Sequence, residues 1–516
     1  MKRWSDLDDD SLWQHIRDVG GIVDVGLRQP GRRSGMQQGR VLLSIAERGA
    51  GRSAVDALTG VDVLSVDTLL PILKLRLRDP DALGKLRRLP QVEYVEPGAF
   101  SADPSRRGLD WLDGSGCSTH LYDGPWNNTQ VTPGDVLPWN YRRMWIDSAW
   151  AYSTGRGITV GLVDTGIDQG VKELNENFSS GWSAGRYFVK EATKPHLGAS
   201  AFWHDTCGHG TRMASVVGAP RNGWGIMGVA YGADLYAVRV DDDVVLTEVE
   251  ATRLGIRRAA TFARIVTLAF GTPFSYSSIS QELSYWYYNS DRVIFAAAGT
   301  SPCWEPIKSV TFPGNLSTVI TVTAFDGTGS IACNAHRGYE VDFAAYTDQP
   351  AQGLDLFGRE LAGLSGSSGA TAVLAGVTAL YVSRNPTATR SQVLSKLIAA
   401  ASPTGGRSPI WGFGIPNVMC LMGEMCTAWI EGPTLIQTSG LYTWRAYQSG
   451  SPGPIAYQWS SGETTQSITR YVSVWPGMQE YLFTLNVTVR DTRNGRTRID
   501  AKPVVVRDPY DCPTCF

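Results

Sequence analysis

The pattern of apolar and polar positions changes three times along the chain and divides it into four regions. In the first region, residues 73–78 alternate strictly between leucine and a basic residue, which is typical of a strand with one buried face. The other elements predicted here are strands at 22–27 and 92–96 and helices at 36–58 and 81–89. Strands and helices mixed in this way predict a small α/β sandwich over residues 1–98.

The second and third regions differ in whether apolar positions recur. Residues 99–138 contain Gly, Ser, Pro, Asn and Trp without a period, which predicts an exposed linker or surface insertion. Residues 139–426 alternate apolar runs with helical patterns, which predicts a parallel sheet covered by helices on both faces. Its predicted strands lie at 158–163, 235–240, 265–269, 293–298 and 319–323. Thr247 and Glu250 have the spacing of a capping box and predict that a helix begins there.

The fourth region, residues 427–516, contains short predicted strands. Residues 481–490 place apolar side chains on one face and polar ones on the other, and Asn494 followed by Gly495 predicts a hairpin turn. Trp444 and Trp459 are candidates for the core. About six or seven short strands predict an immunoglobulin-like β-sandwich, followed by a cysteine-containing tail.

Composition and charge exclude several classes of protein. Of the 516 residues, 43% are hydrophobic and 19% are charged, which is ordinary globular composition and excludes wholesale disorder. Lys and Arg number 47 against 49 for Asp and Glu, and this balance argues against a nucleic-acid or anionic-membrane partner. The longest apolar stretch, residues 369–382, is shorter than the ~20 residues that a membrane span needs. Nothing in the sequence demands more than a monomer.

The cysteines and the N-terminus bear on the compartment. The even number of cysteines, eight, favours disulfides, with free structural thiols and a metal site as alternatives. Cys512 and Cys515 form a lone CxxC pair, with no second pair and no nearby His to complete a zinc site. The first residues contain no apolar segment, so no signal peptide is visible. Disulfides favour an extracytoplasmic, secreted protein whose leader has been removed, and the alternative is an intracellular protein.

Three segments of the α/β region carry candidate catalytic groups. Asp164 ends an apolar strand, His209 lies between two glycines, and Ser368 opens a long apolar helix. Taken singly, each has a structural explanation, namely a turn aspartate, a buried histidine and a helix N-cap. Together they match nucleophilic catalysis, in which the serine attacks, the imidazole accepts its proton and the carboxylate fixes the imidazole.

These segments resemble the signatures of the subtilisin-like serine peptidases, in that family's order. They read Asp-Thr-Gly from Asp164, His-Gly-Thr from His209 and Gly-Ser-Ser-Gly-Ala around Ser368. Ser365 and Ser367 are close neighbours, but only Ser368 has an alanine two residues later, as the family does. The resemblance implies these three residues as the catalytic triad, a polypeptide substrate and hydrolysis through an acyl-enzyme.

The resemblance covers about residues 139–420 and implies the subtilisin-like α/β fold, with no organic cofactor. A second, less specific similarity concerns residues 22–97, which end in Val-Glu-Tyr-Val-Glu-Pro and look like the family's propeptide. It implies that the N-terminal domain is an intramolecular inhibitor and that the protein is made as a zymogen. Processing is then expected between Pro97 and Trp139.

The clearest departure from the family is at the oxyanion site. Thr300 follows an Ala-Ala-Gly run where the family has an asparagine that donates to the oxyanion. A threonine hydroxyl also donates but is shorter than an amide, which makes Thr300 a candidate oxyanion residue. Ala372 and Val373 also replace the usual proline and histidine. The alternative hypothesis is therefore a non-catalytic or weakly active pseudopeptidase that binds a protein or cell-surface partner. A third hypothesis is that the C-terminal sandwich is a targeting unit.

Two clusters raise the question of metal binding. His204, Cys207 and His209 lie close together, but a catalytic His209 cannot also bind zinc and no fourth ligand is evident. The three aspartates at 241–243 are a candidate calcium site, although such a turn is more often merely solvated. The sequence therefore predicts no metal ligand by residue and leaves calcium as a candidate at an unknown site.

Overall fold

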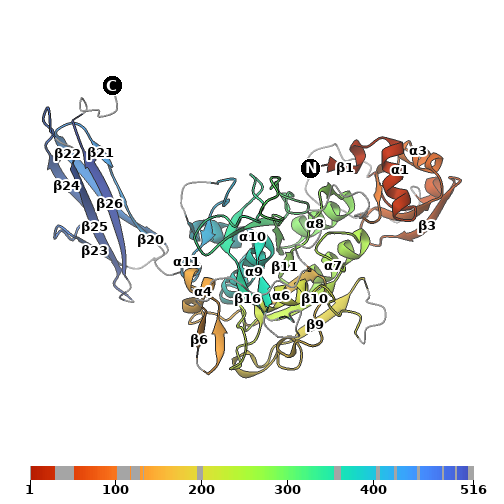
Figure 1. The fold of residues 1–516 in the computed structure, drawn as a ribbon, viewed down its shortest axis with the longest axis horizontal. Helices are drawn as coiled ribbons and strands as arrows, with labels where there is room; N and C mark the ends of the chain where they lie inside the picture. Colours follow the sequence, from red (N-terminus) through yellow and green to blue (C-terminus); the bar gives the residue numbers. More distant parts are fainter. Residues whose placement is uncertain are drawn as a thin grey trace. The chain divides into compact units, whose positions relative to one another are not determined.

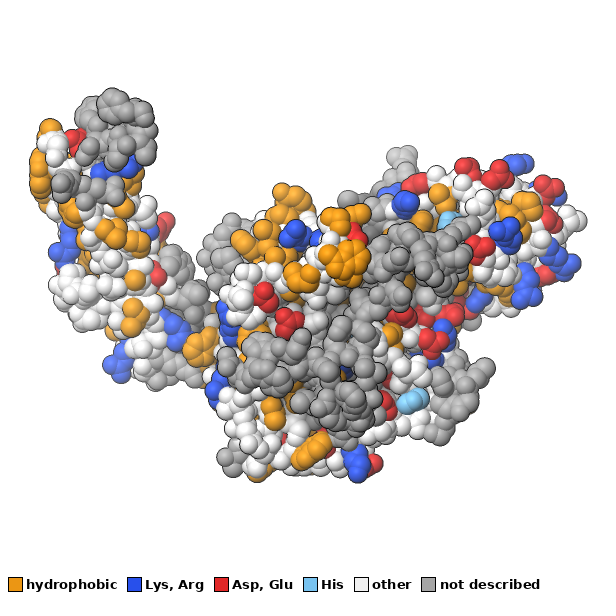
Figure 2. All heavy atoms as spheres, in the orientation of Figure 1, with side chains coloured by type: hydrophobic (Ala, Val, Ile, Leu, Met, Phe, Trp, Pro, Cys, Tyr) orange, Lys and Arg blue, Asp and Glu red, His pale blue; other side chains and the backbone are white. Residues whose placement is uncertain are grey.

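The computed structural model has two compact units, Met1–Ile415 and Pro416–Phe516, whose relative placement is not described (Figure 1). The residues described are 2–28, 52–100, 117, 128–131, 133–194, 201–351, 353, 362–402, 407–423, 427–449, 454–478, 481–493, 495 and 497–508. Among them, no helix has the length and apolar character needed to cross a membrane. Acidic and basic side chains are intermixed over the N-terminal region in Figure 2, in keeping with the near-neutral net charge of −2.

A parallel sheet of seven strands forms the centre of the first unit. Its strand order is β15-β14-β13-β11-β8-β10-β9, and every pairing within it is parallel. The strands are β8 (Thr159–Asp164), β9 (Phe188–Ala192), β10 (Asp234–Arg239), β11 (Ile265–Leu268), β13 (Val293–Ala297), β14 (Ile320–Phe325) and β15 (Phe343–Tyr346). The five predicted strands are confirmed. Their central residues are buried and mostly apolar, as expected of strands covered on both faces.

Helices pack in pairs against this sheet. They are α6 (His209–Gly218), α7 (Val249–Phe262), α8 (Ser277–Asn289), α9 (Gly366–Arg384) and α10 (Arg390–Ala400), preceded by α4 (Trp139–Arg143) and α5 (Ile146–Ala149). Helices α6 and α9 pack against each other, and so do α7 and α8. A Cβ at Gly161 in β8 would lie 3.0 Å from the Cβ atoms of Ala259 and Ala263, so the missing side chain lets α7 approach the sheet closely.

The N-terminal region contains an antiparallel sheet of order β3-β4-β2-β5. Its elements are β2 (Ile22–Leu27), β3 (Val61–Val66), β4 (Ile72–Leu77), β5 (Val92–Pro97), α1 (Asp9–Asp18) and α3 (Pro80–Arg87). The strands predicted at 22–27, 73–78 and 92–96 and the helix predicted at 81–89 are confirmed, whereas most of the predicted helix at 36–58 lies outside the described residues. The sequence did not predict α1, which begins after Asp8, whose Oδ1 accepts a bond from Ser11 N at 2.7 Å.

The predicted capping box at the start of α7 is wrong. The helix begins at Val249, and its N-cap, Glu248, makes no side-chain cap bond. Thr247 Oγ1 donates instead to Asp241 Oδ1 at 2.7 Å, and Glu250 forms an ion pair with Lys74 of the N-terminal region. The side chains of Thr247 and Glu250 therefore bind residues from other parts of the fold and do not cap the helix.

Within residues 99–138, the described part includes a short hairpin, β6 (Thr129–Val131) and β7 (Asp135–Leu137). The second unit contains α11 (Val418–Leu421) and two sheets, of orders β20-β22-β24 and β21-β26-β25-β23. The strands are β20 (Thr427–Glu431), β21 (Leu435–Ile436), β22 (Gly440–Ser449), β23 (Ile455–Trp459), β24 (Ser467–Val472), β25 (Tyr481–Asp491) and β26 (Thr497–Val506). Trp444 and Trp459 are buried in its core, and β25 and β26 form the predicted hairpin. The immunoglobulin-like assignment stays a prediction.

Candidate active site

Asp164 and His209 meet at the carboxyl edge of the central sheet. Asp164 is the last residue of β8, and His209 is the first residue of α6, directly after Gly208 with φ of 80°. His209 Nδ1 lies 2.8 Å from Asp164 Oδ1, and both side chains are about 95% buried. Because a carboxylate only accepts, Nδ1 carries the proton and Nε2 keeps its lone pair for use as a base.

Ser368 lies in the first turn of α9 and lines the same cleft as His209. Its Oγ donates to Ala269 O, directly after β11, at 3.4 Å. Among the hydrogen bonds of the described residues, none joins Ser368 Oγ to His209. A loose serine–histidine geometry is common where no substrate is bound. The cleft is lined by His209, Arg212, Val244, Val245, Ala269, Phe270, Gly271, Thr272, Ala297, Gly299, Thr300, Thr311, Gly363, Leu364, Ser365, Ser367 and Ser368.

Thr300 also lines this cleft, in the turn that follows β13. Its Oγ1 accepts a bond from Ser367 N at 3.1 Å and lies 3.0 Å from Ser367 Oγ. Thr300 therefore contacts Ser367, which is the residue directly before the candidate nucleophile Ser368. The geometry brings His209, Thr300 and Ser368 to one cleft, and Asp164 bonds to His209.

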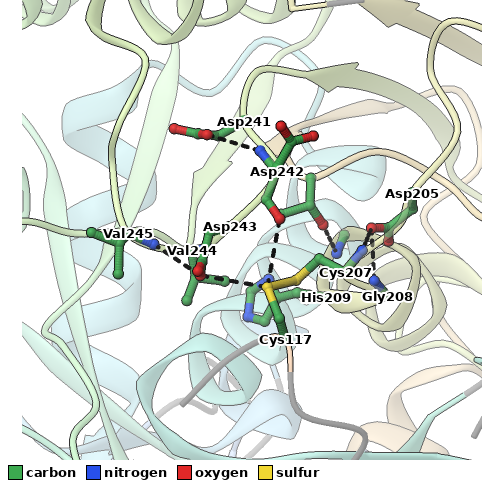
Figure 3. Close-up of a disulfide and its surroundings, with 12 residues drawn as sticks. Cys117, Asp205, Cys207, Gly208, His209, Asp241, Asp242, Asp243, Val244 and Val245 are labelled. Atoms are coloured by element: carbon green, nitrogen blue, oxygen red, sulfur yellow. Dashed lines mark hydrogen bonds between the residues drawn. A yellow bond between two sulfur atoms is a disulfide. The ribbon is translucent and has the colours of Figure 1, made fainter. Parts of the chain in front are cut away.

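A disulfide joins Cys117 to the loop that precedes His209. Cys117 and Cys207 are bonded, and Figure 3 shows His209 beside them. Asp205 Oδ1 accepts from Cys207 N and Gly208 N at 3.0 and 2.7 Å, which orders the turn into α6. Because the Cys207 sulfur is in a disulfide, it is not a free thiolate that could bind a metal at this loop. Within the described ranges, no group of three or more His, Cys, Asp and Glu side chains is placed to hold a metal ion.

Other described cysteines are also disulfide-bonded. Cys303 and Cys333 form a second disulfide, close to the turn that carries Thr300. Cys420 is also disulfide-bonded. The remaining cysteines lie outside the described residues. Disulfides thus account for each cysteine that the structure describes, as the even cysteine number predicted.

The carboxylate oxygens of the acidic turn at 241–243 are bound by protein donors. Asp241 Oδ2 accepts from Thr247 N and Glu248 N, at 2.7 and 2.9 Å. Lys194 Nζ lies 3.3 Å from Asp241 Oδ1 and 2.9 Å from Asp242 Oδ2, so an ammonium group stands among these carboxylates. The turn is therefore held by Lys194 and the start of α7, and calcium stays an untested expectation.

A second polar cluster, next to the turn that carries Thr300, was not predicted from the sequence. His336 Nε2 lies 3.0 Å from Ser301 Oγ, and Lys308 Nζ donates to the same oxygen at 2.9 Å. His336 Nδ1 faces Ser309 O at 2.8 Å, which assigns its proton to Nδ1 and leaves Nε2 as an acceptor. Burial lowers the pKa of His336 to about 4, so the ring is neutral near pH 7. These residues are far apart in the sequence, and no local motif signals them.

Comparison with known proteins gives a consistent result. The family model described as the subtilase family matches residues 155–414. The minor extracellular protease Epr of Bacillus subtilis is 27% identical over 343 residues, covering 65% of this chain and 47% of that protein. Subtilisin E of Bacillus subtilis is 29% identical over 268 residues, 51% of this chain and 65% of the relative. A thermostable alkaline protease of Halalkalibacterium halodurans is 28% identical over 294 residues, 56% of this chain and 74% of the relative. The match thus spans about half of the first relative and under two thirds of the second.

Proposed function

This chain belongs to the subtilase family, and on that premise we propose that it is a secreted serine endopeptidase made as a zymogen. The observation that carries the proposal is the 2.8 Å bond between His209 Nδ1 and Asp164 Oδ1, in a cleft that Ser368 also lines. A buried, correctly protonated imidazole beside a helix-opening serine is the arrangement that nucleophilic acyl transfer requires. The disulfides Cys117–Cys207 and Cys303–Cys333 support an extracytoplasmic location.

In the proposed mechanism, Ser368 Oγ attacks the scissile carbonyl while His209 Nε2 accepts its proton. Asp164 holds the imidazole orientation and stabilises the imidazolium that forms. The Ser368 backbone N–H and the Thr300 hydroxyl stabilise the oxyanion. His209 then gives its proton to the leaving amine, and an activated water hydrolyses the acyl-enzyme. The polypeptide substrate pairs through its backbone with strands at the cleft.

The N-terminal region is proposed to be the intramolecular inhibitor. Its apolar residues share one core with α7, α8 and the loop around Phe274, as Trp4 shows by stacking on Phe274 with ring centroids 4.1 Å apart. Glu96 of β5 accepts from Ser277 N and Ser278 N at the start of α8, at 2.7 and 2.8 Å. Cleavage between Pro97 and Trp139 would free this domain from the peptidase.

The test is fluorophosphonate labelling, with intact mass measured in parallel. Wild type is expected to be labelled at Ser368 after limited proteolysis of the N-terminal region, and Ser368→Ala is expected to remain unlabelled. Ser383→Ala removes a serine from the end of α9, where Ser383 Oγ donates to Arg156 O, and serves as the matched control. Equal labelling of wild type and Ser368→Ala would overturn the serine assignment.

The second candidate is a weakly active or non-catalytic pseudopeptidase that binds a protein or cell-surface partner. Two observations favour it: Thr300 stands in place of an amide donor, and Ser368 Oγ bonds to Ala269 O rather than to His209. Folded wild type that takes no label after removal of the N-terminal region would support this candidate over the peptidase.

A further inference from the structure

Three hydrogen-bonding groups form a chain that ends at the cleft. Gly299 N donates to Ser367 Oγ at 3.1 Å. Ser367 Oγ lies 3.0 Å from Thr300 Oγ1, and either oxygen can be the donor. Ser367 N donates to the same Thr300 oxygen at 3.1 Å. Ser367 is fully buried, whereas Thr300 is partly exposed and faces the cleft.

The hydroxyl protons have two arrangements, and hydrogen-bond satisfaction distinguishes them. If Thr300 donates to Ser367 Oγ, that oxygen accepts two bonds, and the buried Ser367 proton has no further acceptor among the described residues. A buried unsatisfied donor costs about 1–3 kcal/mol. If Ser367 donates to Thr300, both acceptor positions of Thr300 Oγ1 are filled, by Ser367 N–H and by Ser367 O–H.

The second arrangement leaves one proton to place, that of the Thr300 hydroxyl. It cannot return to Ser367, whose proton already lies on that line, and Thr300 has its exposed side toward the cleft. The bonds then run in one direction, from Gly299 N–H through Ser367 O–H to Thr300 O–H. Each donor in such a chain polarises the next, which strengthens the terminal donor.

We propose that Ser367 is a positioning residue that fixes the Thr300 hydroxyl proton toward the oxyanion of the tetrahedral intermediate. This inference rests on the proposed peptidase function and deepens it. It explains how the Thr300 hydroxyl, which would otherwise rotate freely, can donate in a fixed direction as the rigid asparagine amide of the family does. Ser367 fills both acceptor sites of Thr300 and leaves its O–H a single direction.

The backbone around Ser367 is built for this close approach. Gly366 has φ of 64°, a left-handed conformation that favours glycine. A Cβ at Gly366 would lie 2.5 Å from Thr300 Oγ1 and would force the hydroxyl away from Ser367. Thr371 Oγ1 donates to Ser367 O at 2.7 Å and anchors the same turn from within α9.

The experiment is a double-mutant cycle on the processed enzyme, with kcat and KM measured on a peptide substrate. Thr300→Val removes the donor and is expected to lower kcat about 10²-fold. Ser367→Ala leaves the donor but frees its rotation, and is expected to lower kcat about 10-fold with KM unchanged. Ser367→Thr keeps the hydroxyl and should restore kcat. In the Thr300→Val background, Ser367→Ala should have no further effect, because Ser367 acts only through Thr300.

Two controls keep the cycle interpretable. Thr378→Val deletes another buried hydroxyl from α9 and should leave kcat unchanged. Ser367→Cys, whose thiol is a poor donor, replaces Ser367→Ala if the alanine variant does not fold, with the same expected loss. A 10-fold loss that persists in the Thr300→Val background would overturn the positioning role, as would full activity of Ser367→Ala. Wild type without fluorophosphonate labelling would instead reject the proposed function itself.

Discussion

The two regions that flank the subtilase domain, residues 155–414, differ in how they are stabilised. The N-terminal region belongs to the same compact unit as this domain and shares its apolar core. The C-terminal strands form a second unit, with a separate core around Trp444 and Trp459. A region that completes the core of its neighbour is coupled to the neighbour's folding, whereas a region with its own core is not. The difference supports an inhibitor role for the first region and independence for the second.

Charged groups are buried where the N-terminal region meets α7. Asp67 bonds to Arg253, and Arg257 Nη2 lies 3.0 Å from Asp67 Oδ1. Arg257 also pairs with Glu282 of α8 at 2.5 Å. Burial opposes ionisation of Asp67, but the charge of Arg253, the Leu70 N–H and Arg257 together lower the pKa of Asp67 to about 2. Separating the two regions would therefore expose or break a network that neither completes alone.

Deletion of each region in turn gives the largest expected effect. A chain expressed without residues 1–100 is expected to give little folded protein and therefore no fluorophosphonate label, because Phe274 and its neighbours must fold without the residues that cover them. Removal of the same residues by proteolysis after folding is a different case, in which the folded cleft is already formed. A chain without residues 427–516 should fold and be labelled like wild type. Soluble yield and fluorophosphonate labelling are measured for both truncated chains. Equal behaviour of the two truncated chains would contradict the difference between the regions.

A buried ion pair of α7 should contribute more to the free energy of unfolding than an exposed ion pair of the same helix. Arg253→Met leaves Asp67 without its main counter-charge, and we expect a loss of about 3–5 kcal/mol in the free energy of unfolding. Arg258→Met removes an exposed partner of Glu191, 3.6 Å away, and should cost under about 1 kcal/mol. Urea unfolding of the two variants in the Ser368→Ala chain, in which the proposed mechanism precludes self-processing, provides the comparison. Similar losses for the two variants would show that the interface does not depend on this pair.

Two further carboxylates make the interface sensitive to pH. Lys74, Asp24 and Glu96 lie side by side across β4, β2 and β5. Burial, with the nearby charge of Glu250, raises the pKa of Asp24 to about 6, although Arg253 and Lys74 oppose the shift. Burial also raises the pKa of Glu96 to about 7, with the charge of Asp24 adding to the effect and the two α8 amides opposing it.

The direction of the pH effect follows from these shifts. Both pKa values lie above the ordinary 3.8 and 4.5, so the folded chain binds protons at these two groups more tightly than the unfolded chain does. Their contribution is present below about pH 4 and is lost as the pH rises through about 6–7, with about 3 kcal/mol at stake for each group. Asp67 acts oppositely, since its lowered pKa costs stability only as the pH falls from about 4 to 2.

We therefore expect the N-terminal region to dock most firmly near pH 4–5 and to loosen toward pH 8. Hydrogen exchange of β2 and β5 in the Ser368→Ala chain measures this at each pH. Asp24→Asn should flatten the profile because it removes one of the two titrating groups. Protection that increases from pH 5 to pH 8 would contradict the assignment of these carboxylates.

The smallest effect on the peptidase is expected from the core of the second unit. Trp444 is fully buried, and its Nε1 donates to Pro433 O at 2.9 Å. Trp444→Ala should destabilise the C-terminal strands by about 3–5 kcal/mol while labelling of Ser368 stays unchanged. Leu441→Ala, at a position that is 72% exposed, is the control and should alter neither. Loss of labelling in Trp444→Ala would show that the second unit supports the peptidase after all.

The sequence by itself determined many of the strands and the candidate triad. Period-two and apolar runs predicted β2, β4, β5 and the five strands of the parallel sheet, because strand formation depends on neighbouring residues. The motifs around Asp164, His209 and Ser368 could be identified because their flanking glycines and small residues are local requirements of the turns that carry them.

The tertiary structure decided the partners of side chains that lie far apart along the chain. The predicted bond between Thr247 and Glu250 gave way to Asp241 and Lys74, which no local pattern contains. The Cys117–Cys207 disulfide, the cluster around His336 and the alignment of Asp24 with Glu96 depend in the same way on distant segments. Local spacing fixes backbone conformation over a few residues, but burial and hydrogen-bond satisfaction are settled only when the sheets and helices pack.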